Sequence, residues 1–492
     1  MHIKRTAPLA GSHNQRGSPI APDLVGMLPS RREMLKSSAL GMGSLAASWL
    51  LSNSADGKTP VGLTARNPHE RPAIRSVILM MQNGGPSQMD MFDPKPVLQR
   101  GGGRTHDVKV ETFQPGSESN KLLASPFAFQ RKGDCGMELS SVIPHIGGIA
   151  DDLCLVRSMY TEHNNHTEGL VMFMTGRLFQ GRPSFGSWIS YGLGTENQNL
   201  PAYVVLRDPG GYNTSGTLTW SPGWLPALYG GTEFSTQGSP VLNLSPSSKV
   251  DPRNQQQKLD LLTRLNRRHQ ARYLGNTELE SRIQNYELAA RMQLEAVEML
   301  DMRRETQETQ RLYGMDQDVT RAYGTRCLLA RKLVESGVRF VQIHPRPTQP
   351  WDTHNKTATA LPSICNATDL PTAGLIMDLK RRGLLDQTLV IWSGEFGRLP
   401  VSQNGTGRDH NRNAFSLFMA GGGVRPGFVY GETDEIGYSA TVNRVSVPDL
   451  HATVLHQLGL DHELLTYEHQ GRDETLTDPT LTGAHVVTDI LR

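Results

Sequence analysis

Short apolar runs that end at polar residues constrain the fold of this chain more than any other feature. Residues 389–393 read Leu-Val-Ile-Trp-Ser, the composition of a buried strand, and Gly394 separates them from the acidic Glu395. Similar runs, with helical periodicity between them, occur at residues 74–81, 153–159, 202–206 and 339–343. This alternation predicts a three-layer α/β fold with a mainly parallel sheet and helices on both faces.

The length and composition favour one large domain. The chain has 492 residues, of which 37% are apolar and 20% charged, as is ordinary for a globular protein. Its 49 glycines and 30 prolines predict many loops, which suits a large α/β enzyme better than a helical bundle. We expect the domain to cover residues 74–492, and its last part, from about residue 424, to add loops and a helix to the same sheet.

Residues 254–310 differ from their surroundings. They are rich in Gln, Arg, Glu and Leu, and their apolar residues follow helical spacing. The segment therefore predicts two antiparallel helices inserted into the domain. Its charges are typical of solvent-exposed helix faces, and binding of a partner is the alternative interpretation.

The first 55 residues are predicted to be a twin-arginine export signal. Arg31 and Arg32 precede an uncharged apolar stretch at residues 37–51, and small residues follow at 52–55. The stretch is too short to span a bilayer, which takes about 20 residues. We therefore expect export to the periplasm or cell envelope, a linker at residues 56–73, and no transmembrane helix in the mature chain.

The predicted signal also carries the basic charge of the chain. Residues 1–55 hold six Lys or Arg and two Asp or Glu, a net of +4, so the remainder carries −2 of the total +2. A weakly acidic chain without a basic stripe lacks the electrostatic footprint of a nucleic-acid-binding protein. We expect no nucleic-acid partner.

The cysteines point to no metal or disulfide framework. The chain has four, widely spaced and without a C-x-x-C pair: Cys135, Cys154, Cys327 and Cys365. Buried thiols are the favoured interpretation, because cysteine is among the residues most often buried. One or two disulfides remain an alternative.

Residues that bind metal or carry protons follow several of the predicted strands: Asp352, His354, Glu395, Asp409 and His410. The carboxyl ends of parallel strands line the ligand crevice of an open sheet, so these side chains predict one shared site. Mixed oxygen and nitrogen ligands suit a divalent ion, and the sequence does not choose among Zn, Mn, Fe, Ca and Mg. His163 and His166, three residues apart, are a weaker pair that could add a ligand from one helical turn.

Each of these motifs has a structural alternative. Asp352 can cap a turn while His354 is merely exposed, and Glu395 can pair with Arg398 three residues later. Asp409 and His410 can form an orienting pair on a surface loop. Recurrence after separate sheet elements favours a common site over three unrelated ones.

The chain also resembles a known family from about residue 74 to residue 460. The motifs that carry the resemblance are Gly84-Gly85-Pro86-Ser87-Gln88-Met89-Asp90, Asn165-His166 before Thr175-Gly176-Arg177, Gly394-Glu395-Phe396-Gly397-Arg398, and Gly407-Arg408-Asp409-His410-Asn411. They are similar to those of an uncharacterised, twin-arginine-exported bacterial family, a domain of unknown function often labelled sulfatase-like and placed within the alkaline phosphatase superfamily.

The resemblance implies hydrolysis of sulfate or phosphate esters at a metal site, with a nucleophile at the start of the helix that ends in Thr-Gly-Arg. Counting back from that turn, the matching place is about His166, with Thr167 beside it, so the formylglycine cysteine of sulfatases is absent there. Cys327 has a C-x-x-x-R outline within an apparent helix, which we attribute to chance. Asn83 stands where the superfamily usually has a metal-binding aspartate, and Glu395-Phe396 replaces the usual Asp-His pair.

The sequence therefore predicts an exported metal-dependent hydrolase of sulfate or phosphate esters, acting on a small molecule or a polysaccharide. Asp352, His354, Glu395, Asp409, His410 and His163 are the expected metal ligands or their orienting groups. The expected nucleophile is Thr167, beside His166, or a metal-bound water. Arg398 or Arg408 is expected to neutralise an anionic oxygen of the ester. The alternative is a non-catalytic exported protein that uses a degenerate crevice to hold an anionic glycan or an envelope partner. A purely structural envelope protein is the third reading.

Overall fold

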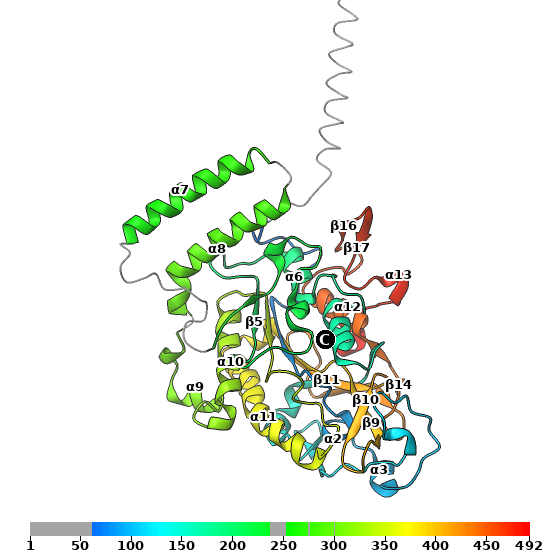
Figure 1. Ribbon diagram of the computed structural model, residues 1–492. Coiled ribbons are helices and arrows are strands. Elements are labelled where there is room, and N and C mark those ends of the chain that lie inside the picture. Colours follow the sequence, from blue (N-terminus) through cyan, green and yellow to red (C-terminus); the bar gives the residue numbers. More distant parts are fainter. Residues whose placement is uncertain (1–61, 237–251, 274–275, 300) are drawn as a thin grey trace, which may run out of the picture. The chain divides into compact units, whose positions relative to one another are not determined.

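The computed structural model describes residues 62–492, apart from 237–251, 274–275 and 300 (Figure 1). The predicted export signal and the first part of the predicted linker lie outside the described residues. Residues 62–73 form no helix, but they hydrogen-bond to the domain, for example from Glu70 N to the Gly459 carbonyl and from Ala73 N to the Gln457 carbonyl.

The centre of the domain is a nine-stranded, mainly parallel sheet in the order β12-β4-β11-β8-β1-β7-β5-β6, with β15 pairing beside β4. Every pairing is parallel except the two made by β11, which runs antiparallel to β4 and β8. The strands are β1 (Ser76–Met81), β4 (Leu153–Tyr160), β5 (Tyr203–Leu206), β6 (Thr232–Glu233), β7 (Phe340–Ile343), β8 (Thr388–Ser393), β11 (Phe415–Gly421), β12 (Phe428–Tyr430) and β15 (Val445–Ser446).

Strands β1, β7 and β8 form the middle of this sheet. Val77 of β1 lies opposite Phe340 of β7 and Leu389 of β8, and all residues of the three strands are buried. Burial on both faces explains why these segments read as continuous apolar runs and not as an alternation of apolar and polar residues.

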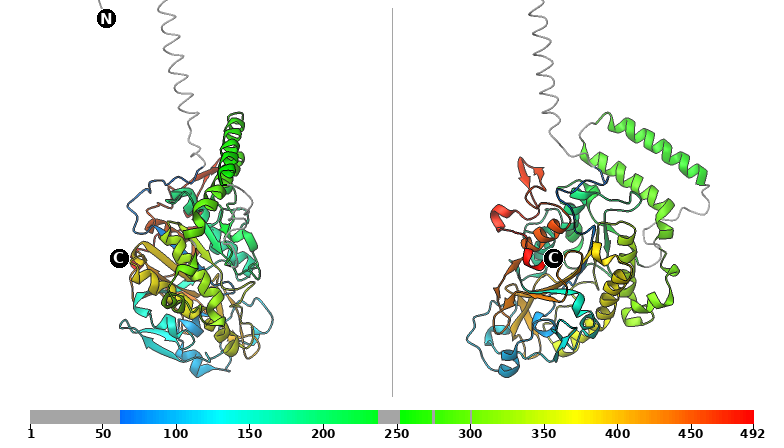
Figure 2. Two further views of the ribbon diagram at one scale, coloured as in Figure 1. Left: turned by 90° about the vertical axis from the view of Figure 1, so that its left-hand side faces the viewer. Right: turned by 180° about the vertical axis from the view of Figure 1, so that it is seen from behind.

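Helices cover both faces of the sheet (Figures 1 and 2). α10 (Asp318–Glu335) and α11 (Thr357–Arg381) pack against each other on one face. The other face carries α5 (His166–Thr175), α6 (Phe185–Leu193) and α12 (Val447–Gln457). The three-layer α/β fold predicted from the sequence is therefore the fold of the domain.

Shorter elements connect these layers. The short helices are α2 (Gln88–Met91), α3 (Pro96–Gly101), α4 (Pro144–Gly147), α9 (Gln307–Leu312) and α13 (Pro479–Thr482). Small antiparallel pairs are formed by β2 (Phe129–Lys132) with β3 (Met137–Ser140), β9 (Gly397–Ser402) with β10 (Arg408–Asn411), β13 (Glu432–Thr433) with β14 (Ala440–Val442), and β16 (Tyr467–His469) with β17 (Arg472–Glu474).

Two long helices, α7 (Pro252–Gln270) and α8 (Thr277–Met299), occupy the segment that the sequence singled out as an insertion. α8 contacts the domain near residues 227–229, and α7 lies on the far side of α8 (Figures 1 and 2). None of the helices in the described part of the chain combines the length and the apolar character that spanning a bilayer requires. All four cysteines are free thiols, three of them buried and Cys135 exposed.

Candidate metal centre

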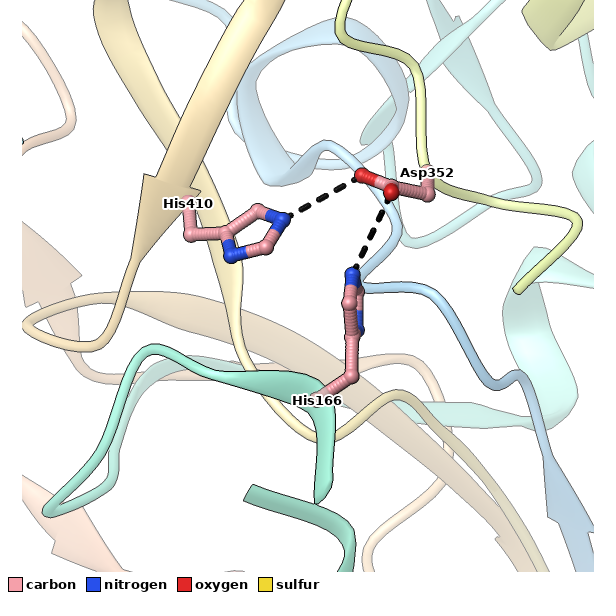
Figure 3. Close-up of side chains that lie close together, drawn as sticks. All are labelled: His166, Asp352 and His410. Atoms are coloured by element: carbon pink, nitrogen blue, oxygen red, sulfur yellow. Dashed lines mark hydrogen bonds and ion pairs between the residues drawn. The ribbon is translucent and has the colours of Figure 1, made fainter. Parts of the chain in front are cut away.

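The predicted site residues reach one place from the carboxyl ends of three sheet strands. Asp352 and His354 lie in the loop after β7, and His166 begins α5 after β4. Glu395 follows β8 directly, and His410 lies in β10 of the hairpin that continues from it. Figure 3 shows His166 and His410 pointing toward the carboxylate of Asp352. The topology therefore gathers residues separated by up to 244 positions, the arrangement expected at the crevice of a parallel sheet.

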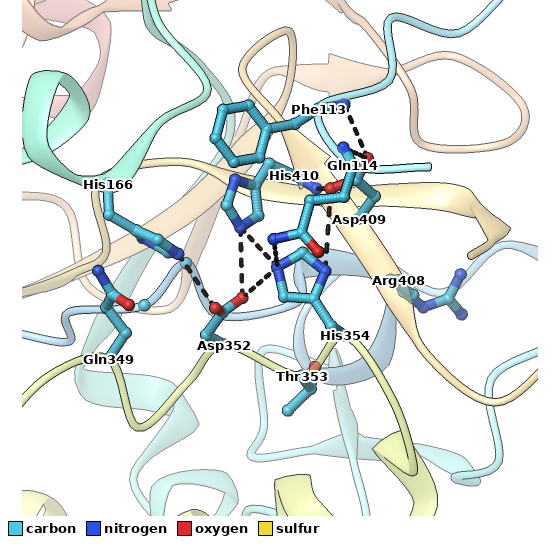
Figure 4. Close-up of polar contacts among 12 residues, drawn as sticks. Phe113, Gln114, His166, Gln349, Asp352, Thr353, His354, Arg408, Asp409 and His410 are labelled. Atoms are coloured by element: carbon cyan, nitrogen blue, oxygen red, sulfur yellow. Dashed lines mark hydrogen bonds and ion pairs between the residues drawn. The ribbon is translucent and has the colours of Figure 1, made fainter. Parts of the chain in front are cut away.

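The Asp352 carboxylate is the centre of the cluster. Its Oδ2 lies 3.3 Å from Nε2 of His166, and its Oδ1 lies 3.0 Å from Nε2 of His354 and 3.3 Å from Nε2 of His410. The last two nitrogens are only 2.9 Å from each other (Figure 4). Three imidazoles thus present the same ring nitrogen, Nε2, to one carboxylate.

The opposite ring nitrogen of each histidine faces an oxygen atom. The Nδ1 atoms of His166, His354 and His410 each lie 2.6 Å from an oxygen, which belongs to Glu395, to the Gln403 side chain and to the Asn164 carbonyl respectively. Carboxylate and carbonyl oxygens accept hydrogen bonds and do not donate them. His166 and His410 therefore carry their proton on Nδ1.

The same conclusion for His354 depends on the orientation of the Gln403 amide. The Gln403 Nε2 lies 3.2 Å from the Pro115 carbonyl, which can only accept, so this atom is the amide nitrogen. The atom facing His354 is consequently the amide oxygen, and His354 Nδ1 donates to it. A neutral imidazole that donates from Nδ1 leaves a lone pair on Nε2.

Each of the three Nε2 atoms consequently lies within 3.3 Å of an oxygen of the same carboxylate, an arrangement that a cation would stabilise. Histidine ligands of metals are typically held in this way, by a hydrogen bond from the other ring nitrogen to an oxygen. Three histidine nitrogens and one carboxylate match the donor set of Zn and of other divalent transition ions. The side chains of Asp352 and His354 are 19% and 15% exposed, so the cluster is open to solvent on one side.

Burial and neighbouring charges shift the pKa values of Asp352, His166 and His410. Burial would raise the pKa of the Asp352 carboxyl, but the Arg398 guanidinium and the three imidazoles hold that pKa well below its usual value. Burial would lower the pKa of His166, but the adjacent carboxylates of Asp352 and Glu395 raise it. For His410, burial outweighs the contact with Asp352 and lowers the pKa to about 3, so this imidazole is neutral near pH 7.

Glu395 is held by backbone amides of the turn after β1. Gly84 N donates to its carboxylate at 2.9 Å and Gly85 N at 3.3 Å, and the side chain is fully buried. The turn requires glycine: Gly84 and Gly85 have φ of 117° and 68°, and a Cβ on Gly84 would lie 2.7 Å from Trp351 N. Glu395 thus links the turn to His166 and acts as an orienting group.

A family model with the description "Protein of unknown function (DUF1501)" matches residues 74–491. The chain belongs to this family. A comparison with functionally curated proteins gave no match.

The solved structures that resemble this DUF1501 protein do so distantly. The PsFucS1 sulfatase from Pseudoalteromonas sp. gives a TM-score of 0.34 at 15% identity over 80% of this chain and 69% of the other. A TAB5 alkaline phosphatase mutant with Mg bound in its M3 site gives a TM-score of 0.33 at 11% identity, over 80% of this chain and 99% of the other. Phosphonate monoester hydrolase SpPMH from Silicibacter pomeroyi gives a TM-score of 0.28 at 14% identity, over 70% of this chain and 72% of the other. Likeness at this level carries no functional argument.

The two arginines singled out in the sequence are fully buried in this DUF1501 domain. Arg398 donates to Asp352 Oδ1 at 2.6 Å and to the carbonyls of Gly84 and Gly85, so it ties the turn to the cluster. Arg408 forms a two-point ion pair with Asp90 at 2.8 and 3.1 Å, and Figure 4 shows it pointing away from the three histidines. Both side chains have 0% exposure, which leaves no surface for an anionic substrate.

Asp409 holds a loop and does not face Asp352. Its Oδ2 accepts hydrogen bonds from Phe113 N at 2.7 Å and Gln114 N at 2.8 Å, and its Oδ1 accepts one from His410 N. The loop so held covers the cluster, because the Phe113 ring stacks on the His410 ring with centroids 4.7 Å apart (Figure 4). Asp409, His354 and His410 also have atoms close enough to share an ion, but the three backbone donors make Asp409 the weaker ligand candidate.

The remaining predicted residues lie beside the cluster. His163 precedes α5, and its Nδ1 accepts a hydrogen bond from Asn165 N. Thr167 is the second residue of α5 and is half-buried, and its carbonyl accepts a hydrogen bond from the Ser215 hydroxyl. Asn83 is fully buried, with Oδ1 3.3 Å from His344 Nδ1 and Nδ2 bonded to the Thr348 carbonyl.

Sequence reasoning missed the groups that orient the histidines. Gln403, the Asn164 carbonyl and the Phe113-Gln114 loop carry no motif of their own. The Asn164 carbonyl acts through its backbone, which any residue would supply. Gln403 precedes the bend between β9 and β10, where nothing in the sequence distinguishes it from a surface glutamine.

Proposed function

We propose that this protein is a metal-dependent hydrolase of sulfate or phosphate esters. The observation that carries the proposal is the convergence of three Nε2 lone pairs on the Asp352 carboxylate, each fixed by an oxygen acceptor behind the ring. The family resemblance of the motifs at residues 84–90 and 394–411 supports ester hydrolysis as the chemistry.

His166, Asp352, His354 and His410 are the proposed ligands. A divalent ion bound there would polarise an ester oxygen and lower the pKa of bound water. The protein's own contribution is orientation: Glu395 and Gln403 fix two of the rings, and Arg398 holds Asp352 through its Oδ1. Because Glu395 and Arg398 are buried, His166 and Asp352 are positioned before any substrate arrives.

One ion fits the residues better than two. The usual second carboxylate after β1 is replaced by Asn83, whose amide is already engaged with His344 and the Thr348 carbonyl. Asp409, the other acidic candidate, already accepts three backbone hydrogen bonds. We therefore propose a single ion in place of a clamp of two ions.

Water is the nucleophile that we propose. His166, at the place matching the superfamily nucleophile, is instead enclosed between Glu395 and Asp352. Among the described residues, the hydroxyl of Thr167 forms no hydrogen bond with the cluster. We also propose that residues 1–55 direct export by the twin-arginine route and that the substrate is an anionic ester, in a small molecule or a glycan.

The test is turnover of aryl sulfates, aryl phosphates and phosphodiesters by the full chain, loaded in turn with Zn, Mn, Fe, Ca and Mg. We expect one ester class to be hydrolysed, with a loss of at least about 100-fold in kcat/KM in His354→Ala and normal turnover in His163→Ala. His163 is the matched control, because it lies close to α5 but outside the cluster.

Two results would contradict the proposal. Equal turnover in wild-type protein and His354→Ala would place the chemistry elsewhere or attribute it to a contaminant. Tight binding of a sulfated glycan without turnover in any metal-loaded form would favour the alternative, an exported binding protein. The observation that supports this alternative is Asn83, a neutral residue at the position where the superfamily usually has a metal-binding aspartate.

A further inference from the structure

Helix α7 exposes its leucines to solvent. Leu261, Leu262 and Leu265 are 50%, 53% and 50% exposed, and their spacing of three and four residues puts them on one side of the helix. Tyr286 of α8, which is 75% exposed, borders the same groove as Leu262. Isolated apolar residues on a surface are ordinary, but several on one helix face mark an interaction surface.

The opposite side of α7 packs on α8. Leu259, Thr263, Asn266 and Gln270 are spaced four, three and four residues apart, and all four are half-buried. Figures 1 and 2 show α8 between α7 and the rest of the domain. A helix of a globular protein usually turns its apolar stripe inward. In contrast, α7 turns a largely polar side toward α8 and leaves Leu261 and Leu265 on the outer side, with Leu262 at the edge of the groove between the two helices.

The exposed side is also basic. Lys258 and Arg268 continue the same face on either side of Leu261 and Leu265, Arg264 lies next to it, and all three cations are exposed. Asp260 is the one acidic residue in the helix. Leucines interleaved with cations on one face fit a surface that is negatively charged outside and apolar beneath.

We propose that the outer face of α7, defined by Lys258, Leu261, Arg264, Leu265 and Arg268, binds an anionic lipid membrane surface. The leucines enter the boundary between headgroups and acyl chains, and the long cationic side chains extend to the lipid phosphates. This inference is independent of the chemistry at Asp352.

A second copy of this chain is the less favourable occupant. A symmetric dimer places the same patch of each subunit against itself, so two α7 faces would bring cations against cations. A bilayer containing anionic lipid supplies both the negative charge and the apolar layer.

The test is flotation of the full chain with vesicles of phosphatidylglycerol and phosphatidylcholine, compared with phosphatidylcholine alone. We expect binding to the anionic vesicles that weakens as salt is added. Leu261→Ser/Leu265→Ser and Arg264→Glu/Arg268→Glu should each weaken binding about tenfold or more. The matched controls are Leu464→Ser/Leu481→Ser, both leucines being 66% exposed, and Arg104→Glu/Arg131→Glu, both exposed and outside α7.

All the variants keep residues 1–61, so a second measurement is needed to show which part of the chain contacts the vesicles. Hydrogen exchange makes that measurement on the unmodified protein. Vesicles should slow amide exchange at residues 258–270, and circular dichroism should show that each variant keeps its helices. The proposal is overturned by vesicle binding without protection of α7 or by variants that bind as tightly as wild type. Self-association that the α7 variants abolish would overturn it as well, since the face would then join two copies of the chain.

Discussion

The Nε2 atoms of His354 and His410 lie 2.9 Å apart, and the proton of each ring is on the far nitrogen, Nδ1. Two lone pairs at this distance repel each other unless a positive charge lies nearby. Asp352 Oδ1, within 3.3 Å of both nitrogens, adds a negative charge that the Arg398 guanidinium offsets from 2.6 Å. The two facing nitrogens favour a bound cation between them, and the oxygen acceptors behind each ring keep them in place.

Glu395→Gln tests whether the buried carboxylate orients His166. Glutamine keeps the size but has one acceptor oxygen, and its NH2 group would face the donors Gly84 N or His166 Nδ1. We expect metal affinity, measured by competition with a chelator, to fall about 10–100-fold. Glu468→Gln, an exposed carboxylate in β16, is the matched control. Unchanged affinity in Glu395→Gln would show that Glu395 does not support the ligand.

Asp409→Asn tests the role of Asp409 as an anchor for the loop above His410. Hydrogen bonds to a charged acceptor contribute about 1.5–3 kcal/mol, so their weakening should speed amide exchange at Phe113 and Gln114 by about 10–100-fold. Metal stoichiometry should stay the same, because the proposed ligands are intact. Loss of the ion in this variant would instead make Asp409 a ligand, as the sequence suggested.

The Asp90–Arg408 ion pair should stabilise the fold and take no part in chemistry. Both side chains have 0% exposure, so Asp90→Ala leaves an unpaired buried guanidinium. We expect the free energy of unfolding in urea to fall by roughly 3–5 kcal/mol. Asp318→Ala breaks the exposed pair with Arg321 and should cost no more than about 1 kcal/mol. Similar losses in the two variants would contradict the importance of the buried pair.

His451 should make the domain sensitive to acid. Burial lowers its pKa to about 4, against a hydrogen bond from Nε2–H to the Phe173 carbonyl that acts in the opposite direction, and Nδ1 is buried without a partner. In the unfolded chain the pKa is about 6.5. Because the folded value is depressed, this contribution is present above pH 6.5 and is lost as the pH falls toward 4.

Between pH 7 and pH 5 the loss from His451 amounts to about 2 kcal/mol. His451→Gln can keep the donor to the Phe173 carbonyl but does not titrate. Its free energy of unfolding should therefore fall by about 2 kcal/mol less than that of wild type over this interval. Equal falls in both proteins would mean that His451 does not control the acid response.

The sequence predicted the layers well, because strands buried on both faces leave continuous apolar runs such as that of β8. It did not indicate that β11 runs antiparallel, since side-chain periodicity carries no information on strand direction. Residues 352, 354, 395 and 410 were found from their positions after strands. The sequence did not show that His166 joins them while His163 stays outside the cluster. That outcome depends on the start of α5, whose first residue is His166.

The orienting groups could not be predicted from local sequence. His410 donates to a backbone carbonyl 246 residues away, and His354 donates to a glutamine 49 residues away. Such contacts arise only when the β9–β10 hairpin packs against the loops after β4 and β7. The buried state of Arg398 and Arg408 was likewise invisible in the sequence, where an arginine beside an acidic residue suggests anion binding.

The metal content of the full chain, purified without chelators or an affinity metal column and measured by elemental mass spectrometry, tests the central claim most directly. We predict about one divalent ion per chain in wild type and in His163→Ala, and its loss in Asp352→Ala and His410→Ala. The contrary result is a well-folded wild-type protein that holds no ion after incubation with Zn, Mn, Fe, Ca and Mg, or an ion that both cluster variants retain.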